Sequence, residues 1–378
     1  MELQSSMTLS IKAKAGSEDQ KKQKVINLAS GDPYATTPQP IIDYAMKMAS
    51  EGKTHYTPSR GLLELRELVS EKLRAENNIE CTSENILITP SKTAVNLALF
   101  AIAEAGEEIL VPEPFYVSYP YMAKLNGLVP VVVRLNDDFD FDFDSLERSV
   151  TEKTRGILIS NPSNPTGKVY SEKTLRELYE FAEGHGLILI SDDIYERFVF
   201  EGSHFSLSSI KGSDENTVTI GGFSKCFSMT GWRIGYIVGN REFISQVDKI
   251  QQHLLTCAPS VSQYAAIYGL RNRSMVNDFV KDTRKRREIV DAILKESNGI
   301  TYTKPQGGFY YFPHISDSSD HASFSEGLLK EKNVSVTPGI AFGPSFKDYF
   351  RLSFVAASLD DLKTGTEYLV DYIGKSIQ

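Results

Sequence analysis

The chain has 378 residues, which suffices for one large domain or two ordinary ones with a self-sufficient hydrophobic core. Its 41 Lys and Arg residues against 49 Asp and Glu residues give a net charge of −8, and this acidic balance argues against a nucleic-acid-binding module and against a basic membrane-surface helix. The 3 cysteines are far apart and never in CxxC spacing, so they disfavour a disulfide scaffold or a zinc ribbon and favour a reducing compartment.

The N-terminal segment is polar and has no apolar stretch of the kind that secretory signals contain. Its charged part, from Lys12 to Lys24, predicts a solvated arm. The longest apolar run in the chain, AVNLALFAIA, is shorter than the roughly 18 residues of a membrane span. We therefore expect a soluble, cytoplasmic protein without a membrane partner.

Helical patterns follow over Ile41–Glu51 and Leu62–Glu76, and then the middle of the chain alternates apolar runs with further helices. The apolar runs are continuous, which indicates strands buried on both faces. The predicted strands are Ile86–Thr89, Glu108–Val111, Val129–Val133, Gly156–Ser160, Leu187–Ser191, Thr217–Gly221 and Gly235–Gly239. The predicted helices between them are Ser91–Ala105, Glu172–Glu183 and Arg241–Leu254. This alternation predicts an α/β fold with a mostly parallel seven-stranded sheet and helices on both faces.

Beyond the sheet, the pattern predicts a long helix over Val276–Ser297 and strands at Gly308–Phe312 and Phe350–Phe354. We expect a large domain over residues 50–285. Residues 1–49, with the arm, and 286–378 are expected to form a smaller α+β domain from both chain ends.

Polar residues gather directly after five of the predicted strands. The segments are PSKT after Thr89, PEPFY after Val111, NPSNPTG after Ser160, DDIY after Ser191 and GFSKCFSMTGWR after Gly221. Ligands of open parallel sheets bind beyond the carboxyl ends of the strands, so these segments are expected to line one crevice.

Several familiar site types do not match these segments. No GxGxxG follows a strand, NPTGKV lacks the Walker spacing, and GFSKC ends in Cys226 where a nucleophile elbow needs Gly. No histidine is in HExxH or another ligand spacing, so no metal site is expected. A lysine, a carboxylate, a phenol, an amide, an aromatic ring and an arginine instead suit an aldehyde cofactor with a phosphate and a pyridine ring, to which the lysine binds as an imine.

The residues that carry this chemistry resemble those of the fold-type I, class I and II pyridoxal-phosphate aminotransferases, in particular the bacterial and archaeal aspartate aminotransferases. The resemblance runs from VINLASG at 25–31 to RLSF at 351–354. Its most specific part is SKCFSMTGWRIGY at 224–236, supported by NPSNPTG at 161–167 and SDDIYER at 191–197. It implies pyridoxal 5'-phosphate as the cofactor and a ping-pong exchange of an amino group between an L-amino acid and a 2-oxo acid.

The resemblance assigns roles around the cofactor ring. Lys225 matches the Schiff-base lysine, and Asp192 matches the aspartate that faces the pyridine nitrogen. Tyr195 and Asn164 correspond to the groups at the ring hydroxyl, and Tyr116 to the aromatic residue stacked on the ring.

For the cofactor phosphate, the resemblance implies the helix start at Ser91 and Lys92, together with Arg233. Gly222 stands where many relatives have Ser, so we assign the hydroxyl role to Ser224. Tyr56 matches a tyrosine that reaches the phosphate of the partner subunit, which implies a homodimer with shared sites.

On the substrate side, Arg351 matches the arginine that binds the α-carboxylate as a bidentate fork, with Asn164 and Gly31 beside it. Lys92 matches a lysine that contacts the distal carboxylate of dicarboxylic substrates. We therefore expect aspartate or glutamate with 2-oxoglutarate. The alternatives are aromatic or other neutral amino acids, or a C–S lyase reaction on the same fold. The acidic chain and the short segment before Val25 argue against a regulator with a DNA-binding module.

Overall fold

The computed structural model describes residues 25–316 and 321–376, and its centre is a seven-stranded sheet. The strand order is β2-β8-β7-β6-β5-β3-β4. The bounds are β2 Ile86–Ile88, β3 Glu108–Glu113, β4 Val129–Arg134, β5 Thr154–Ser160, β6 Ile188–Asp192, β7 Thr217–Gly222 and β8 Gly235–Val238. Strand β8 alone runs opposite to the other six strands of this sheet. The predicted mostly parallel, seven-stranded sheet is confirmed.

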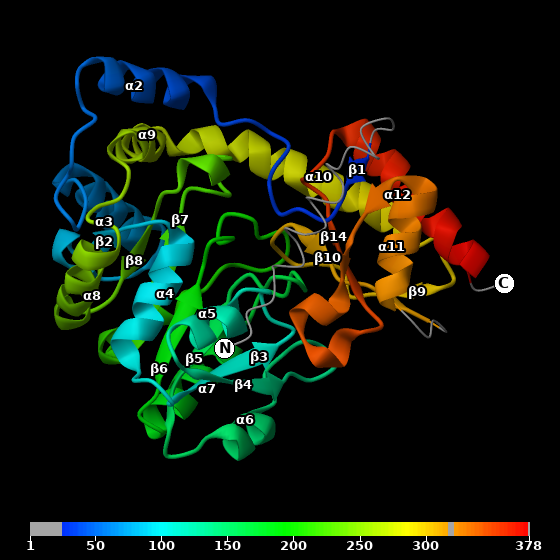
Figure 1. Cartoon of the computed structure of the whole chain (residues 1–378), viewed down its shortest axis with the longest axis horizontal. Coiled ribbons are helices and arrows are strands. Elements are labelled where there is room, and N and C mark those ends of the chain that lie inside the picture. Colours follow the sequence, from blue (N-terminus) through cyan, green and yellow to red (C-terminus); the bar gives the residue numbers. More distant parts are fainter. Residues whose placement is uncertain (1–24, 317–320, 377–378) are drawn as a thin grey trace.

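Helices cover both faces of the sheet (Figure 1). One face carries α4 Ser91–Ile102, α5 Tyr119–Leu125 and α8 Arg241–Leu254, and the other carries α6 Phe143–Ser149 and α7 Glu172–Gly184. Successive side chains of a strand point to opposite faces. In β3, Ile109 and Val111 therefore pack under α4 and α5, while Leu110 packs with α6 and α7.

A further group of helices packs around β2 and β8. These helices are α2 Gln39–Ser50, α3 Leu63–Asn77 and α9 Ser260–Arg271. Their buried residues, including Ile41, Val69 and Ala265, share a core with Ile88 and Val238.

Strand β4 departs from the expectation of burial on both faces. Val129 is 46% exposed and Val132 is 39% exposed, whereas Val133 is buried. The cause is the position of β4 at the edge of the sheet, where it has one neighbouring strand and incomplete helical cover. The continuous apolar run therefore predicted the strand correctly, but its burial on both faces was predicted wrongly.

The two chain ends meet in a second, smaller α+β unit. Strand β1 Ile26–Asn27 pairs in parallel with β12 Val334–Ser335. Its other elements are α10 Val276–Leu294, β9 Ile300–Thr301, β10 Tyr310–Tyr311, β11 His314–Ile315, α11 His321–Lys332, β13 Thr337–Pro338, β14 Phe350–Ser353 and α12 Leu359–Ser376. Figure 1 shows α10 reaching from the large unit toward α11 and α12. The arm predicted over residues 12–24 lies outside the described residues.

Candidate active site

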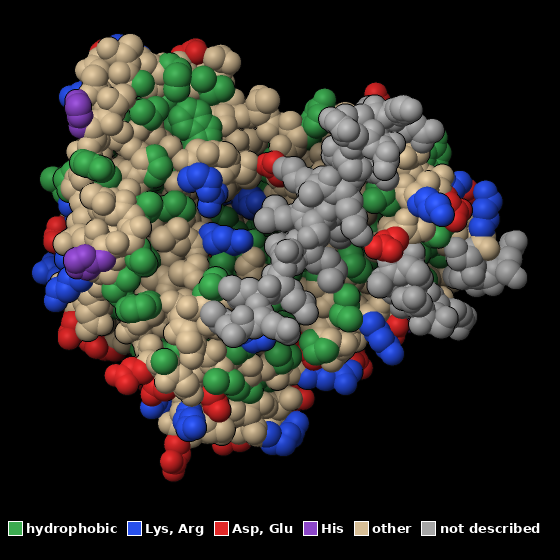
Figure 2. All heavy atoms as spheres, viewed as in Figure 1, with side chains coloured by type: hydrophobic (Ala, Val, Ile, Leu, Met, Phe, Trp, Pro, Cys, Tyr) green, Lys and Arg blue, Asp and Glu red, His purple; other side chains and the backbone are tan. Residues whose placement is uncertain are grey.

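A pocket of about 370 Å³ lies beyond the carboxyl ends of β5, β6 and β7. Residues from both chain ends close it from the side of the smaller unit. Every predicted site residue except Tyr56 lines this pocket. Figure 2 shows Lys and Arg side chains gathered at a hollow near the centre of the face in view. The lining residues are Ser30, Gly31, Asp32, Ser91, Lys92, Val95, Tyr116, Tyr119, Met122, Ser160, Asn164, Asp192, Ile194, Tyr195, Ser224, Lys225, Thr230, Arg233, Tyr310 and Arg351.

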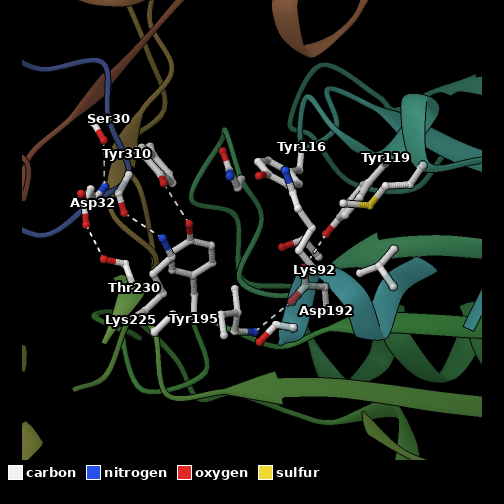
Figure 3. A pocket seen from close by; sticks show the side chains of 18 of the residues that line it. Ser30, Asp32, Lys92, Tyr116, Tyr119, Asp192, Tyr195, Lys225, Thr230 and Tyr310 are labelled. Carbon is white, nitrogen blue, oxygen red and sulfur yellow. Dashed lines mark hydrogen bonds between the residues drawn. The ribbon is translucent and has the colours of Figure 1, made fainter. Parts of the chain in front are cut away.

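Lys225 follows the end of β7 and points into this pocket (Figure 3). Its Nζ donates a hydrogen bond of 2.8 Å to the carbonyl oxygen of Gly31. Burial lowers the pKa of Lys225 to about 8, an effect that Arg351 increases and the carboxylate of Asp32 opposes. Near neutral pH a larger fraction of the molecules therefore has a neutral Lys225 amine than an ordinary lysine would give.

Asp192 is the last residue of β6, and its carboxylate lines the pocket. Its Oδ2 accepts a 2.9 Å hydrogen bond from Tyr119 Oη, and its Oδ1 accepts one from the backbone N–H of Ile194 at 3.3 Å. Burial raises the pKa of Asp192 to about 6, and the bond from Tyr119 limits that increase. The neighbouring Asp193 does not line the pocket; its carboxylate contacts His204 instead.

Tyr119 was not predicted from the sequence. It lies three residues after Tyr116, at the first residue of α5, and the two rings meet edge to face with centroids 5.3 Å apart. In the sequence it is one more aromatic residue in a helix that packs on the core. Only the fold brings its hydroxyl to Asp192.

The first turn of α4 forms another part of the pocket wall. Ser91 Oγ donates to the carbonyl oxygen of Gly221 at 3.0 Å, and Lys92 Nζ lies 5.7 Å from the ring centroid of Tyr116. The position of Ser91 explains Gly222, because a Cβ atom there would lie 2.3 Å from Ser91 Oγ. A serine at 222 would require the Ser91 side chain to move, while the buried Ser224 lines the pocket.

Arg233 lines the pocket from a left-handed backbone conformation, with φ at 53°. Its Nη1 donates to the carbonyl oxygen of Thr230 at 2.9 Å, and the side chain is exposed. Tyr56 is 86% exposed and does not line the pocket.

Arg351 on β14 is 2% exposed. Its Nη1 donates to Asn164 Oδ1 at 2.9 Å and its Nη2 to the carbonyl oxygen of Ala29 at 2.7 Å. The guanidinium carbon lies 4.2 Å from the ring centroid of Tyr310. Within the described residues, its Nε is buried without a hydrogen-bond partner. A buried guanidinium with an unpaired N–H suits an incoming carboxylate.

Tyr310, Asp32 and Thr230 are further residues that the sequence did not indicate. The hydroxyls of Tyr310 and Tyr195 are 2.8 Å apart, and Thr230 Oγ1 donates to Asp32 Oδ1 at 2.6 Å (Figure 3). Tyr310 also explains Gly31, because a Cβ atom at 31 would lie 2.0 Å from Tyr310 Oη.

The residues present fit pyridoxal phosphate. The start of helix α4 with Ser91, together with Arg233, suits a phosphate. The pocket also contains Asp192, a buried carboxylate whose raised pKa reflects a desolvated charge that a protonated ring nitrogen would stabilise. The side chain of Lys225 points into the same pocket (Figure 3). The fold and the site define a pyridoxal-phosphate-dependent enzyme of fold type I.

Comparison with known proteins identifies the family within this class of enzymes. The family model for aminotransferase class I and II matches residues 23–369, so the chain belongs to this family. It is a pyridoxal-phosphate-dependent aminotransferase, which exchanges an amino group between an amino acid and a 2-oxo acid.

Its relatives have different substrates in their names. The (5-formylfuran-3-yl)methyl phosphate transaminase of Methanocaldococcus jannaschii is 40% identical over 93% of this chain and 92% of the relative. An aspartate aminotransferase of Pyrococcus abyssi is 40% identical over 88% of each chain, and the aromatic-amino-acid aminotransferase 2 of Thermococcus litoralis is 38% identical over 88% of each. The structure of Thermus thermophilus aspartate aminotransferase with maleate has a TM-score of 0.92 at 32% identity, over 98% of this chain and 97% of that chain.

Proposed function

We propose that this aminotransferase prefers dicarboxylic substrates, with L-aspartate or L-glutamate as the amino donor and 2-oxoglutarate as the acceptor. One observation carries the proposal: beside Lys225 and Arg233, the pocket contains the cations Arg351 and Lys92, and within the described residues no ion pair involves either of these two. A substrate with two carboxylates would satisfy both. Maleate, which is bound by the similar Thermus thermophilus enzyme, is also a dicarboxylate.

In the proposed reaction, Arg351 binds the substrate α-carboxylate through its guanidinium, with Asn164 held beside it. When bound, pyridoxal phosphate supplies an aldehyde carbon and a ring that stabilises negative charge on the substrate's α-carbon. Lys225 Nζ takes the proton from that carbon and later returns one, since its lowered pKa leaves a fraction of the amine neutral.

The remaining predicted residues would hold the cofactor. We assign Asp192 to the ring nitrogen, where the carboxylate keeps a proton in place, and Tyr195 and Asn164 to the ring hydroxyl. Tyr116 would stack on the ring. Ser91, Ser224 and Arg233 are assigned to the phosphate, together with the backbone of Lys92 in the first turn of α4, which leaves the Lys92 side chain for the substrate; all four residues line the pocket.

We further propose a homodimer with shared active sites, in which Tyr56 reaches the phosphate of the partner's cofactor. Its exposed side chain, outside its own pocket, supports this role. A tyrosine that serves only its own subunit's site would be expected to line it.

The proposed domain division is 50–285 against 1–49 with 286–378. Against a boundary at residue 50, Ile41 and Ala45 of α2 pack in the core around β2 and β8, so limited proteolysis should test whether the large domain begins before α2. We propose the cytoplasm as the location, supported by the free thiols of Cys81, Cys226 and Cys257. Within residues 25–316 and 321–376, no helix has the length and apolarity of a membrane span.

A second candidate is aromatic amino acids. Tyr116, Tyr119, Met122 and Val95 give the pocket an apolar wall, and the similar Thermococcus litoralis enzyme carries that activity in its name. Lys92 separates the two candidates, because its charge benefits a distal carboxylate and not a phenyl ring.

The test is single-turnover spectroscopy of the holoenzyme with each of the twenty amino acids, repeated on Lys92→Met. We expect kcat/KM for aspartate to fall about tenfold in Lys92→Met, equivalent to roughly 1.4 kcal/mol, with phenylalanine unaffected. Lys124→Met is the matched control, because Lys124 is exposed and does not line the pocket. A wild-type response to phenylalanine alone would overturn the dicarboxylate proposal and support the aromatic one.

A further inference from the structure

Behind the pocket, the carboxylate of Asp193 is buried in a separate polar cluster. Asp193 is 2% exposed, and Ser191 Oγ donates to its Oδ1 at 2.5 Å. His204 Nε2 lies 3.1 Å from Asp193 Oδ2, and Ser206 Oγ donates to the same oxygen at 3.3 Å. None of these four residues lines the pocket, and the reaction described above uses none of them.

Asp193 is the direct neighbour of Asp192, so its charge acts on that carboxylate. Two buried anions next to each other each disfavour the ionised state of the other. The charge of Asp193 accordingly contributes to the raised pKa of Asp192, after burial. A cation beside Asp193 would cancel this effect.

His204 is placed to be that cation. Its side chain is 9% exposed. Although burial acts to lower the pKa of His204, Asp193 and then Glu196 raise it overall, and the ammonium of Lys72 opposes them. On the other side of the ring, Nδ1 lies 3.5 Å from Asn161 Nδ2.

The contact with Asn161 favours a neutral ring, because an amide N–H would donate to Nδ1. At 3.5 Å this contact is long, and the same amide nitrogen already donates to the carbonyl oxygen of Phe205 at 3.1 Å. The carboxylate of Asp193 is nearer and charged, so it determines the state of His204.

We propose that His204 is a positioning residue that, as an imidazolium, neutralises Asp193 and thereby keeps Asp192 ionised to hold the cofactor's ring nitrogen. The inference rests on the role proposed above for Asp192. His204 touches neither the cofactor site nor the substrate site; it acts through the charge of Asp193.

The test compares holoenzymes of the wild type, His204→Gln, Asp193→Asn and the double variant. His204→Gln leaves Asp193 uncompensated, so the acid limb of the kcat/KM profile should move up by about 1 pH unit. Asp193→Asn removes the anion while Glu196 still favours the charged form of His204, so the remaining imidazolium should move the acid limb down. The double variant, with neither charge, should lie close to the wild type. A merely structural role would move both single variants in the same direction and leave the double variant worst.

Cofactor release gives a readout that does not depend on turnover. His204→Gln should release pyridoxal phosphate on dilution about tenfold faster than the wild type at pH 6, and at a similar rate at pH 8. His185→Gln is the control, since His185 pairs with Glu147 at the end of α7, away from the pocket. If His204→Gln does not fold, the downward shift in Asp193→Asn still tests the proposal.

Unchanged profiles in His204→Gln, or shifts of the same sign in both single variants, would overturn the inference. Asp192→Asn separates this failure from that of the proposed function. If Asp192→Asn loses activity while His204→Gln behaves as the wild type, only the role of His204 is wrong. If Asp192→Asn keeps the wild-type profile, the role of Asp192 is wrong and that of His204 falls with it.

Discussion

Gly31 leaves room for the hydroxyl of Tyr310, which in turn contacts Tyr195 and lies over the guanidinium of Arg351. We predict that Gly31→Ala raises the KM for the amino acid substrate about tenfold or more, because the new methyl group displaces Tyr310 and with it Arg351. Steady-state kinetics of the holoenzyme measure the effect.

Removal of the colliding hydroxyl provides the control. A Cβ atom at 31 would lie 2.0 Å from Tyr310 Oη but 3.1 Å from its Cζ, so Gly31→Ala/Tyr310→Phe should recover part of the lost affinity. A double variant with a KM no better than that of Gly31→Ala would show that the collision is not the cause.

Tyr119 stabilises the ionised form of Asp192 through its hydrogen bond. Without it, the pKa of Asp192 should rise further, and in the role proposed for Asp192 the protonated carboxyl would no longer hold a positive ring nitrogen. Tyr119→Phe should therefore lower activity about tenfold at pH 6 and less at pH 8. A pH–rate profile checks this, with Tyr368→Phe on the exposed face of α12 as the control. An equal loss at both pH values would contradict the argument.

At the residue scale, the sequence indicated those residues that follow a strand within a recognisable motif. Lys225, Asp192 and Asn164 could be predicted in this way, and all three line the pocket. Tyr310 and Tyr119 could not. Each is a buried aromatic residue in an apolar segment, where core packing and a polar contact give the same pattern, and their partners lie 115 and 73 positions away.

At the element scale, helix α3 is tied to the turn after β6 by a buried ion pair between Lys72 and Glu196, in which Asn77 Nδ2 also donates to Glu196 at 2.6 Å. Glu196→Gln would leave the Lys72 ammonium buried without a counter-charge, at a cost of about 3 kcal/mol in the free energy of unfolding. Chemical denaturation at pH 7 measures it.

Replacing both partners should recover much of this loss, so Lys72→Met/Glu196→Gln is expected to be more stable than either single variant. The pair also has a pH signature. Burial acts to raise the pKa of Glu196, but Lys72 lowers it overall, so its contribution to stability is present at neutral pH and is lost as the pH falls through the lowered value. A wild-type denaturation midpoint in Glu196→Gln would refute the role of the pair.

The strands and helices themselves were predictable because each apolar run, and each helical segment between two runs, can be recognised from neighbouring residues in the sequence. Strand β7 covers Thr217–Gly222, one residue more than the predicted Thr217–Gly221. Helix α8 has the predicted bounds, Arg241–Leu254. The order of the strands could not be predicted. The insertion of β8 between β2 and β7 depends on long-range pairing, as does the edge position that exposes β4.

At the scale of the whole molecule, the proposed shared site predicts complementation. Lys225→Ala and Tyr56→Ala should each be nearly inactive as homodimers. In a mixed dimer, one site combines both lesions and the other has an intact Lys225 with an intact Tyr56 from the partner. Mixing and refolding the two variants should therefore restore activity, up to about one quarter of the wild-type value if subunits pair at random. Mixtures that remain as inactive as the separate variants would contradict a shared site.

The connection of β1 with β12, and the contacts of Lys225 and Arg351 with the backbone at Gly31 and Ala29, draw the start and the far end of the chain to one place. Residues 91–233 contain the groups assigned to the cofactor within one subunit, whereas the arginine assigned to the substrate carboxylate comes only at 351. During synthesis on the ribosome, the residues assigned to the cofactor therefore emerge well before this arginine does.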